Sequence, residues 1–117
     1  MASSAPPNRL DERLAQAREQ GRAALIGYLV AGDPDLKTSE LVIRAVVEAG
    51  LDVLELGIPY SDPIADGPTI AAGGQRALAA LTTLEKTLGL VAEIGDLVPV
   101  VLFTYFNPVF QYGIERF

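Results

Sequence analysis

The chain has 117 residues, enough for about one domain, and half of them are hydrophobic, which is high for a small soluble domain. A net charge of −6 argues against binding to nucleic acids or anionic membranes, and no apolar run is long enough to span a bilayer, so we expect a soluble cytoplasmic protein. Cysteine and histidine are absent. This excludes disulfides and thiolate metal sites, and leaves any acid–base chemistry to carboxylates, tyrosine or lysine.

Predicted helices and predicted strands alternate along the chain. The start lacks the apolar centre of a secretory signal, so we expect residues 1–8 to be a disordered tip and residues 9–117 to form one domain. A first helix is predicted over residues 9–20 with Asn8 as N-cap, and a second over 37–49 with Gly50 as the stop. A third helix is expected to begin at Pro68, and a fourth to run from a Thr82–Glu85 capping box to Glu93. A turn at residue 107 is expected to lead into a fifth helix. Nearly continuous apolar runs predict buried strands over residues 23–32, 52–56 and 97–106.

This alternation predicts an α/β fold of parallel strands joined by right-handed crossovers. Both a doubly wound sheet and a (β/α)8 barrel fit the pattern. No GxGxxG or GxxxxGK[ST] motif follows the first predicted strand. The absence of both motifs weakens a nucleotide-binding interpretation.

Glu55 is a carboxylate inside a predicted core strand. In the run Val53-Leu54-Glu55-Leu56, alternate side chains point to opposite faces, so Glu55 shares a face with Val53 and not with the leucines. A glutamate facing the helices of a barrel would be buried in an apolar layer at high cost. An inward Glu55 would instead lie near the carboxyl end of its strand, where barrel active sites are built, and partial burial would favour its protonated form. The structural alternative is a buried Glu55 paired with an arginine or bound by backbone N–H groups.

Asp66 follows in a loop that contains three prolines and two glycines over residues 57–68. So many conformationally special residues indicate a specified path, and specified loops after strands tend to carry function. Taken alone, Asp66 is also explained as a residue beside a helix N-cap, and Asp62 as a turn starter before Pro63. Tyr28, Phe103 and Tyr105 lie in the two other predicted strands, and could form an aromatic wall for a flat apolar ligand or simply be core aromatics.

Three segments carry a family resemblance. ELGIPYSDPIADGPTI (55–70), YLVAGDPD (28–35) and TYFNPVFQYGIERF (104–117) closely resemble the tryptophan synthase alpha chain, and the similarity extends from Leu10 to Phe117. The resemblance implies a (β/α)8 barrel and a lyase of tryptophan biosynthesis that cleaves indole-3-glycerol phosphate to indole and glyceraldehyde 3-phosphate. It implies no metal or organic cofactor. Glu55 matches the family's proton-transferring glutamate, and Asp66 matches the aspartate that holds the indole N–H.

The resemblance also implies further contacts. Tyr28, Ile70 and Phe103 resemble residues that pack on the indole ring, and Tyr105 resembles a nearby pocket residue. In the family the alpha chain binds a beta chain that uses pyridoxal phosphate, and indole passes between the two. The parts that contact the beta chain are matched here by Pro59, Asp62, Asn107 and Pro108.

Two departures from the family pattern stand out. Ala71 replaces the usual glutamine after GPTI, and Gly73 and Gly74 follow, each of which weakens a helix by about 1 kcal/mol relative to alanine. The chain also stops after about three predicted strands, so we expect a truncated barrel without the later loops that hold the substrate phosphate. Two alternatives follow: a non-catalytic fragment that binds the beta chain or a complementing barrel fragment, and a free-standing lyase of the same fold.

Overall fold

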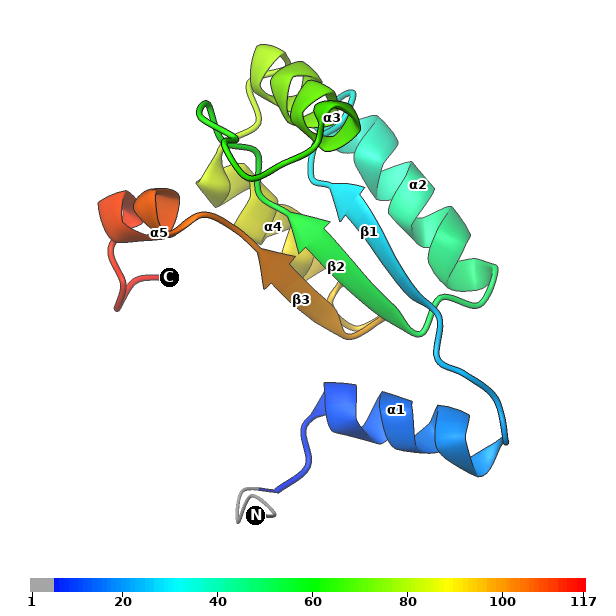
Figure 1. Cartoon of the computed structure of the whole chain (residues 1–117). Helices are drawn as coiled ribbons and strands as arrows, with labels where there is room; N and C mark the ends of the chain where they lie inside the picture. The colour runs from blue at the N-terminus through cyan, green and yellow to red at the C-terminus, as the bar shows by residue number, and fades with distance from the viewer. Residues whose placement is uncertain (1–5) are drawn as a thin grey trace.

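The computed structural model describes residues 6–117, so residues 1–5 of the expected disordered tip lie outside the described part. Within residues 6–117, three parallel strands form one sheet in the order β1-β2-β3, and there are five helices (Figure 1). The strands are β1 (Ile26–Val30), β2 (Val53–Gly57) and β3 (Val100–Phe103). The helices are α1 (Arg9–Glu19), α2 (Leu36–Glu48), α3 (Pro68–Ala79), α4 (Leu84–Ile94) and α5 (Phe106–Tyr112).

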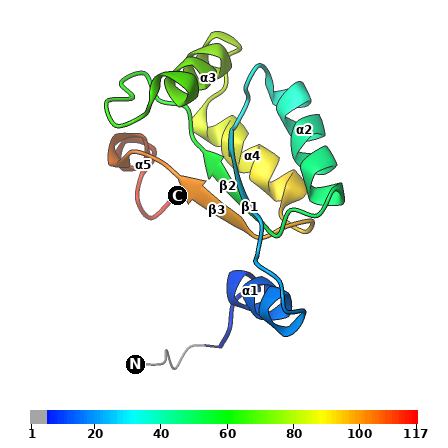
Figure 2. The same ribbon diagram turned by 45° about the vertical axis from the view of Figure 1, so that its right-hand side comes forward.

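One face of the sheet carries the core. Helices α2 and α4 lie side by side on that face (Figure 2). Leu54 and Leu56 of β2 point toward them and are completely buried, together with Ile43 of α2 and Ile94 of α4. β2 is buried because it lies between two strands and under both helices, and this arrangement confirms the predicted parallel α/β units.

The two outer strands are shorter and more exposed than predicted. The expected buried strands over 23–32 and 97–106 shrink to β1 and β3, and their side chains are mostly half-buried or exposed. Ile26 is 49% exposed and Val101 is 37% exposed. Each outer strand has one neighbour among residues 6–117, and α2 and α4 cover the same face of the sheet, so an apolar sequence here does not mean burial.

Two predictions about helix starts have different outcomes. Asn8 caps α1 as predicted, since its side chain accepts the Asp11 N–H. The Thr82–Glu85 capping box is wrong: Thr83 is the N-cap of α4 and accepts the Lys86 N–H at 3.1 Å. Thr82 is instead buried, and within the described residues its hydroxyl oxygen finds no hydrogen-bond partner.

Helix α1 lies below the amino ends of the strands (Figure 1). In the segment between α1 and β1, the Arg22 guanidinium donates to both oxygens of Asp52 at 2.7 and 2.9 Å, and the Leu25 N–H donates to the same carboxylate at 2.8 Å. These donors hold the pKa of Asp52 well below its usual range. Asp52 therefore fixes the start of β2. None of the helices found within residues 6–117 is both long enough and apolar enough to cross a bilayer.

Candidate active site

Glu55 lies on the face of the sheet that α2 and α4 do not cover. It is half-buried between its register partners Tyr28 on β1 and Val101 on β3. This placement follows from strand alternation, because Leu54 and Leu56 must point into the core. None of the three ion pairs found within residues 6–117 includes Glu55, so the arginine-paired alternative does not hold in this part of the chain.

Tyr28 is the aromatic centre of the site. A methyl group placed on Gly57 would lie 2.0 Å from the Tyr28 hydroxyl oxygen, so this glycine allows the tyrosine to pack against the end of β2. The Tyr28 ring meets Phe103 edge to face with centroids 5.9 Å apart. Burial raises the pKa of Tyr28, and the negative charges of Asp66 and Glu55 raise it further.

Asp66 reaches this site on a loop that is bound to the segment after β3. The Ala65 N–H donates to the Tyr105 hydroxyl oxygen at 2.9 Å, and the Tyr105 ring lies 5.2 Å from that of Tyr60. Asp66 lies beside the N-cap of α3, Gly67, as the structural explanation expects, but no side chain caps that helix through a hydrogen bond. Asp66 is half-buried and lines a pocket of about 210 Å³. The other lining residues are Ala65, Phe103, Thr104 and Tyr105.

Two expected positions differ in the structure. Tyr105 lies beyond the end of β3, where it is the N-cap of α5, so its predicted place in the third strand is wrong. The rings of Tyr105 and Phe103 still line the same pocket. Ile70 is half-buried in the first turn of α3 and is not among the residues that line the pocket with Asp66.

The residues matched to a partner interface lie on two segments that touch each other. Asp62 and Asn107 are exposed, while Pro59 and Pro108 are half-buried. The Asn107 side-chain amide donates to the Tyr60 hydroxyl oxygen at 3.0 Å, which joins the loop after β2 to the start of α5. Sequence reasoning missed the role of Tyr60. Its position between Pro59 and the Ser-Asp-Pro turn was the available signal.

No group of three or more acidic, histidine or cysteine side chains that could hold a metal ion occurs among the residues that the structure describes. The arrangement is two carboxylates and an aromatic wall at the carboxyl edge of parallel strands. This edge is where enzymes built from β/α units place their active sites. Fold and site thus fit the class of α/β proteins whose sites lie at this edge of a parallel sheet, among them the (β/α) barrels.

Comparisons with known proteins identify the family within that class. The family model described as "Tryptophan synthase alpha chain" matches residues 14–117, and the chain belongs to this family. A structure of tryptophan synthase from Mycobacterium tuberculosis in an aminoacrylate-bound form is 43% identical, with a TM-score of 0.87 over 93% of this chain. The tryptophan synthase subunit alpha from Legionella pneumophila str. Paris is 37% identical, with a TM-score of 0.89 over 94% of this chain. The family and the barrel fold predicted from the sequence are thereby confirmed.

The chain spans less than half the length of these solved chains, covering 45% of the first and 43% of the second. Its three strands and five helices correspond to the amino-terminal part of their barrel. The alpha chains of this family need no cofactor, since pyridoxal phosphate belongs to the beta chain.

Proposed function

We propose that this chain carries the proton-transfer site of the family's retro-aldol reaction, the cleavage of indole-3-glycerol phosphate to indole and glyceraldehyde 3-phosphate in tryptophan biosynthesis in the cytoplasm. The observation that supports the proposal best is that Glu55 lies opposite Tyr28 in the β1–β2 register, while Asp66 lines a pocket with Phe103, whose ring packs on Tyr28. The two carboxyl groups come from a strand and from a loop, and differ in their surroundings. A pair of carboxyl groups in different surroundings can divide acid and electrostatic roles.

In the proposed reaction Glu55 supplies and accepts protons. Its carboxyl group protonates C3 of the indole ring, and its carboxylate then helps to remove the proton from the glycerol hydroxyl. The C–C bond breaks as that hydroxyl becomes a carbonyl, and the bonding electrons return to the ring, which leaves as indole. Glu55 is half-buried and takes part in none of the three ion pairs found within residues 6–117, so no cation there blocks its contact with a substrate.

Asp66 has the electrostatic role. Protonation of C3 places positive charge on the indole ring, and an ionised carboxylate that accepts the indole N–H lowers the free energy of that state. Phe103 and Tyr105 line the pocket beside Asp66, and Tyr28 packs on Phe103. These three rings would hold the flat indole, with Ile70 at the margin of the site.

The test is indole release from indole-3-glycerol phosphate by a complete barrel, made by joining residues 1–117 to the remaining strands of the M. tuberculosis alpha chain. Glu55→Gln should lower turnover by about 10²-fold to 10⁴-fold, as expected for loss of a general acid. Asp66→Asn should lower it by about 10²-fold to 10³-fold, as expected for loss of one preorganised electrostatic contact. Glu93→Gln is the control, because Glu93 is exposed on α4, on the other face of the sheet. Retained turnover in Glu55→Gln would remove Glu55 from its role.

We also propose that the chain binds a tryptophan synthase beta chain through the loop after β2 and the start of α5. The Asn107–Tyr60 hydrogen bond supports this, because it joins the two segments matched to the family's interface. Calorimetric titration with a beta chain should release heat, and Asp62→Ala and Asn107→Ala should weaken binding. Lys37→Ala on α2, exposed on the far side of the sheet, should not. Binding without indole release by the joined barrel would favour the non-catalytic alternative, and indole release without binding would favour a free-standing lyase.

A further inference from the structure

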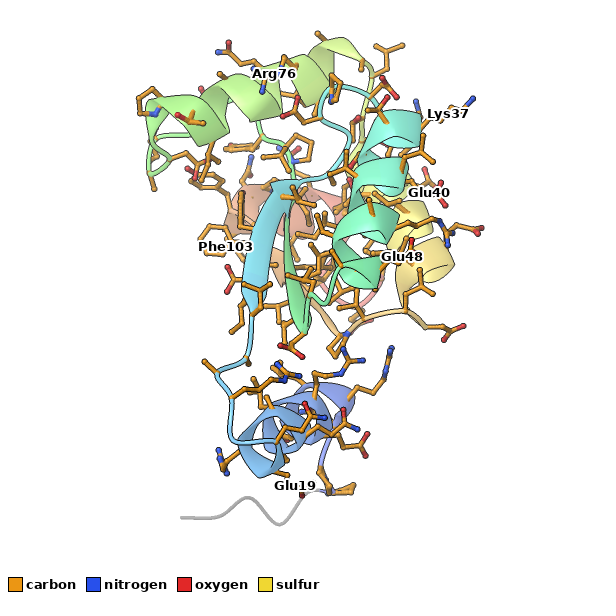
Figure 3. The ribbon with its side chains drawn as sticks, turned by 90° about the vertical axis from the view of Figure 1, so that its right-hand side faces the viewer. Glu19, Lys37, Glu40, Glu48, Arg76 and Phe103 are labelled. Carbon is orange, nitrogen blue, oxygen red and sulfur yellow. The ribbon has the colours of Figure 1, made fainter. Side chains whose placement is uncertain are left out.

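Helix α3 is fixed across the carboxyl end of β1 by one ion pair. Arg76 of α3 donates from Nε to Asp33 Oδ1 at 2.7 Å and from Nη2 to Oδ2 at 2.9 Å, and Asp33 lies in the turn after β1. Figure 3 shows Arg76 on α3 above the end of β1. A two-pronged pair of this kind fixes an angle as well as a distance, because both the guanidinium and the carboxylate are planar.

Two glycines show how closely the helix and the turn approach each other. A methyl group placed on Gly73 would lie 2.8 Å from Asp33 Oδ2, so α3 has room for the ion pair only without a side chain there. Gly32 has a positive φ of 79°, and a methyl group on it would lie 2.0 Å from Oγ1 of Thr82, which follows α3. The turn after β1 thus lies close to α3 both within the helix and just past its end, and an added methyl group at either glycine would require a neighbouring side chain to move.

This contact bears on Asp66 because α3 begins at Pro68, two residues after the acid. On its other side the loop is held by the hydrogen bond from the Ala65 N–H to Tyr105. Asp66 therefore lies between two anchors, one on the segment after β3 and one on the turn after β1. We propose that Asp33 and Arg76 are positioning residues, which hold α3 over β1 and thereby fix Asp66 in the pocket that it lines with Phe103 and Tyr105.

The importance of this anchor rests on the proposed role of Asp66, but its test does not use turnover. Amide hydrogen exchange is followed by NMR on the 117-residue chain at two reporters: Ala65, whose N–H is bound at the loop, and Leu54, whose N–H donates to the Pro99 carbonyl in the sheet. The variants are Asp33→Asn, Arg76→Gln and the double variant. Arg44→Gln is the control, because it removes an ion pair to Glu40 on α2 that does not touch α3.

We expect Arg76→Gln to accelerate exchange at Ala65 by roughly two- to fivefold, the range for a partly exposed ion pair, relative to any change at Leu54. The double variant should match the single ones, because each already abolishes the pair. Equal acceleration at Ala65 and Leu54 would show a general loss of stability and overturn the proposal, as would Ala65 exchange equal to that of Arg44→Gln. If Arg76→Gln unfolds the chain, Arg76→Lys replaces it, since lysine keeps the charge without the paired donors, and Ala65 exchange as slow as in the parent would then overturn the proposal.

Discussion

The two faces of the sheet are built from the same strands but differ in what covers them. On the covered face Leu54 and Leu56 are completely buried against Ile43 and Ile94. On the open face Tyr28, Glu55 and Phe103 are half-buried or exposed, and Figure 3 shows Phe103 on the side away from α2.

The difference teaches how one short strand can serve both stability and chemistry. Alternation sends every second side chain of β2 into the apolar core, where burial supplies most of the free energy of folding. Of the side chains on the other face, Val53 at the amino end of β2 is also buried, whereas Glu55 nearer the carboxyl end is half-buried. A carboxyl group is tolerated on the open face, where it keeps contact with water and with a substrate. The following predictions test how far stability and function separate between the two faces.

The largest expected loss of stability lies on the covered face. Leu54→Ala should lower the free energy of unfolding by about 3 kcal/mol, because it removes buried methyl groups and leaves a cavity beside α2 and α4. Val101→Ala is the matched truncation on the open face and should cost less than about 1 kcal/mol. Urea unfolding measures both. Similar losses would mean that the open face contributes as much to stability as the core does.

The second effect concerns the acid at the amino end of the same strand. The Arg22 guanidinium and the Leu25 N–H hold the pKa of Asp52 below that of the unfolded chain, so the unfolded state binds more protons in acid. The stabilising contribution of Asp52 is thus complete above the unfolded pKa of about 4, and is lost as the pH falls below it. Asp52→Asn should lower stability at pH 7 and make it depend less on pH in the acid range, as measured by urea unfolding across that range. Glu93→Gln, a change at an exposed position of α4, is the control, and an unchanged acid dependence in Asp52→Asn would contradict the assignment.

A third, smaller effect separates two neighbouring glycines of α3. Gly74→Ala should stabilise the chain by about 1 kcal/mol, because a methyl group there meets no atom within 4 Å and alanine favours the helix. Gly73→Ala gains the same helical propensity but drives a methyl group against Asp33 Oδ2, so it should be less stable than Gly74→Ala by about 1–2 kcal/mol. Thermal unfolding compares the pair. Equal stabilisation by both changes would show that α3 does not depend on close contact with the turn after β1.

Much of the covered face could be predicted from the sequence. The order of strands and helices, and the face to which Glu55 points, follow from the spacing of apolar residues within short segments, which is a local property. The resemblance over 55–70 named the two acids, and the family match supports the assignment without testing their roles.

What the sequence could not provide depends on contacts between distant segments. Thr82 looks like a helix cap in isolation, but it is buried against Gly32, so Thr83 takes that role. From the sequence, Gly73 and Gly74 are expected only to weaken α3. In the structure Gly73 packs close to Asp33, which lies in the turn after β1. Tyr105 falls within the apolar run that predicts a strand over residues 97–106, whereas β3 ends at Phe103. In each case tertiary packing decides between two locally acceptable conformations.

The smallest expected effect lies at the loop above the open face. Tyr105→Phe removes the oxygen that accepts the Ala65 N–H and should lower the free energy of unfolding by about 1 kcal/mol or less, because the exposed amide can bond to water instead. Tyr112→Phe, a change of the same kind at the end of α5, is the control for urea unfolding. In the joined barrel, Tyr105→Phe should reduce indole release more than this stability loss explains, since the loop carries Asp66. A loss of stability as large as that of Leu54→Ala, with turnover unchanged, would reverse the division of roles between the two faces.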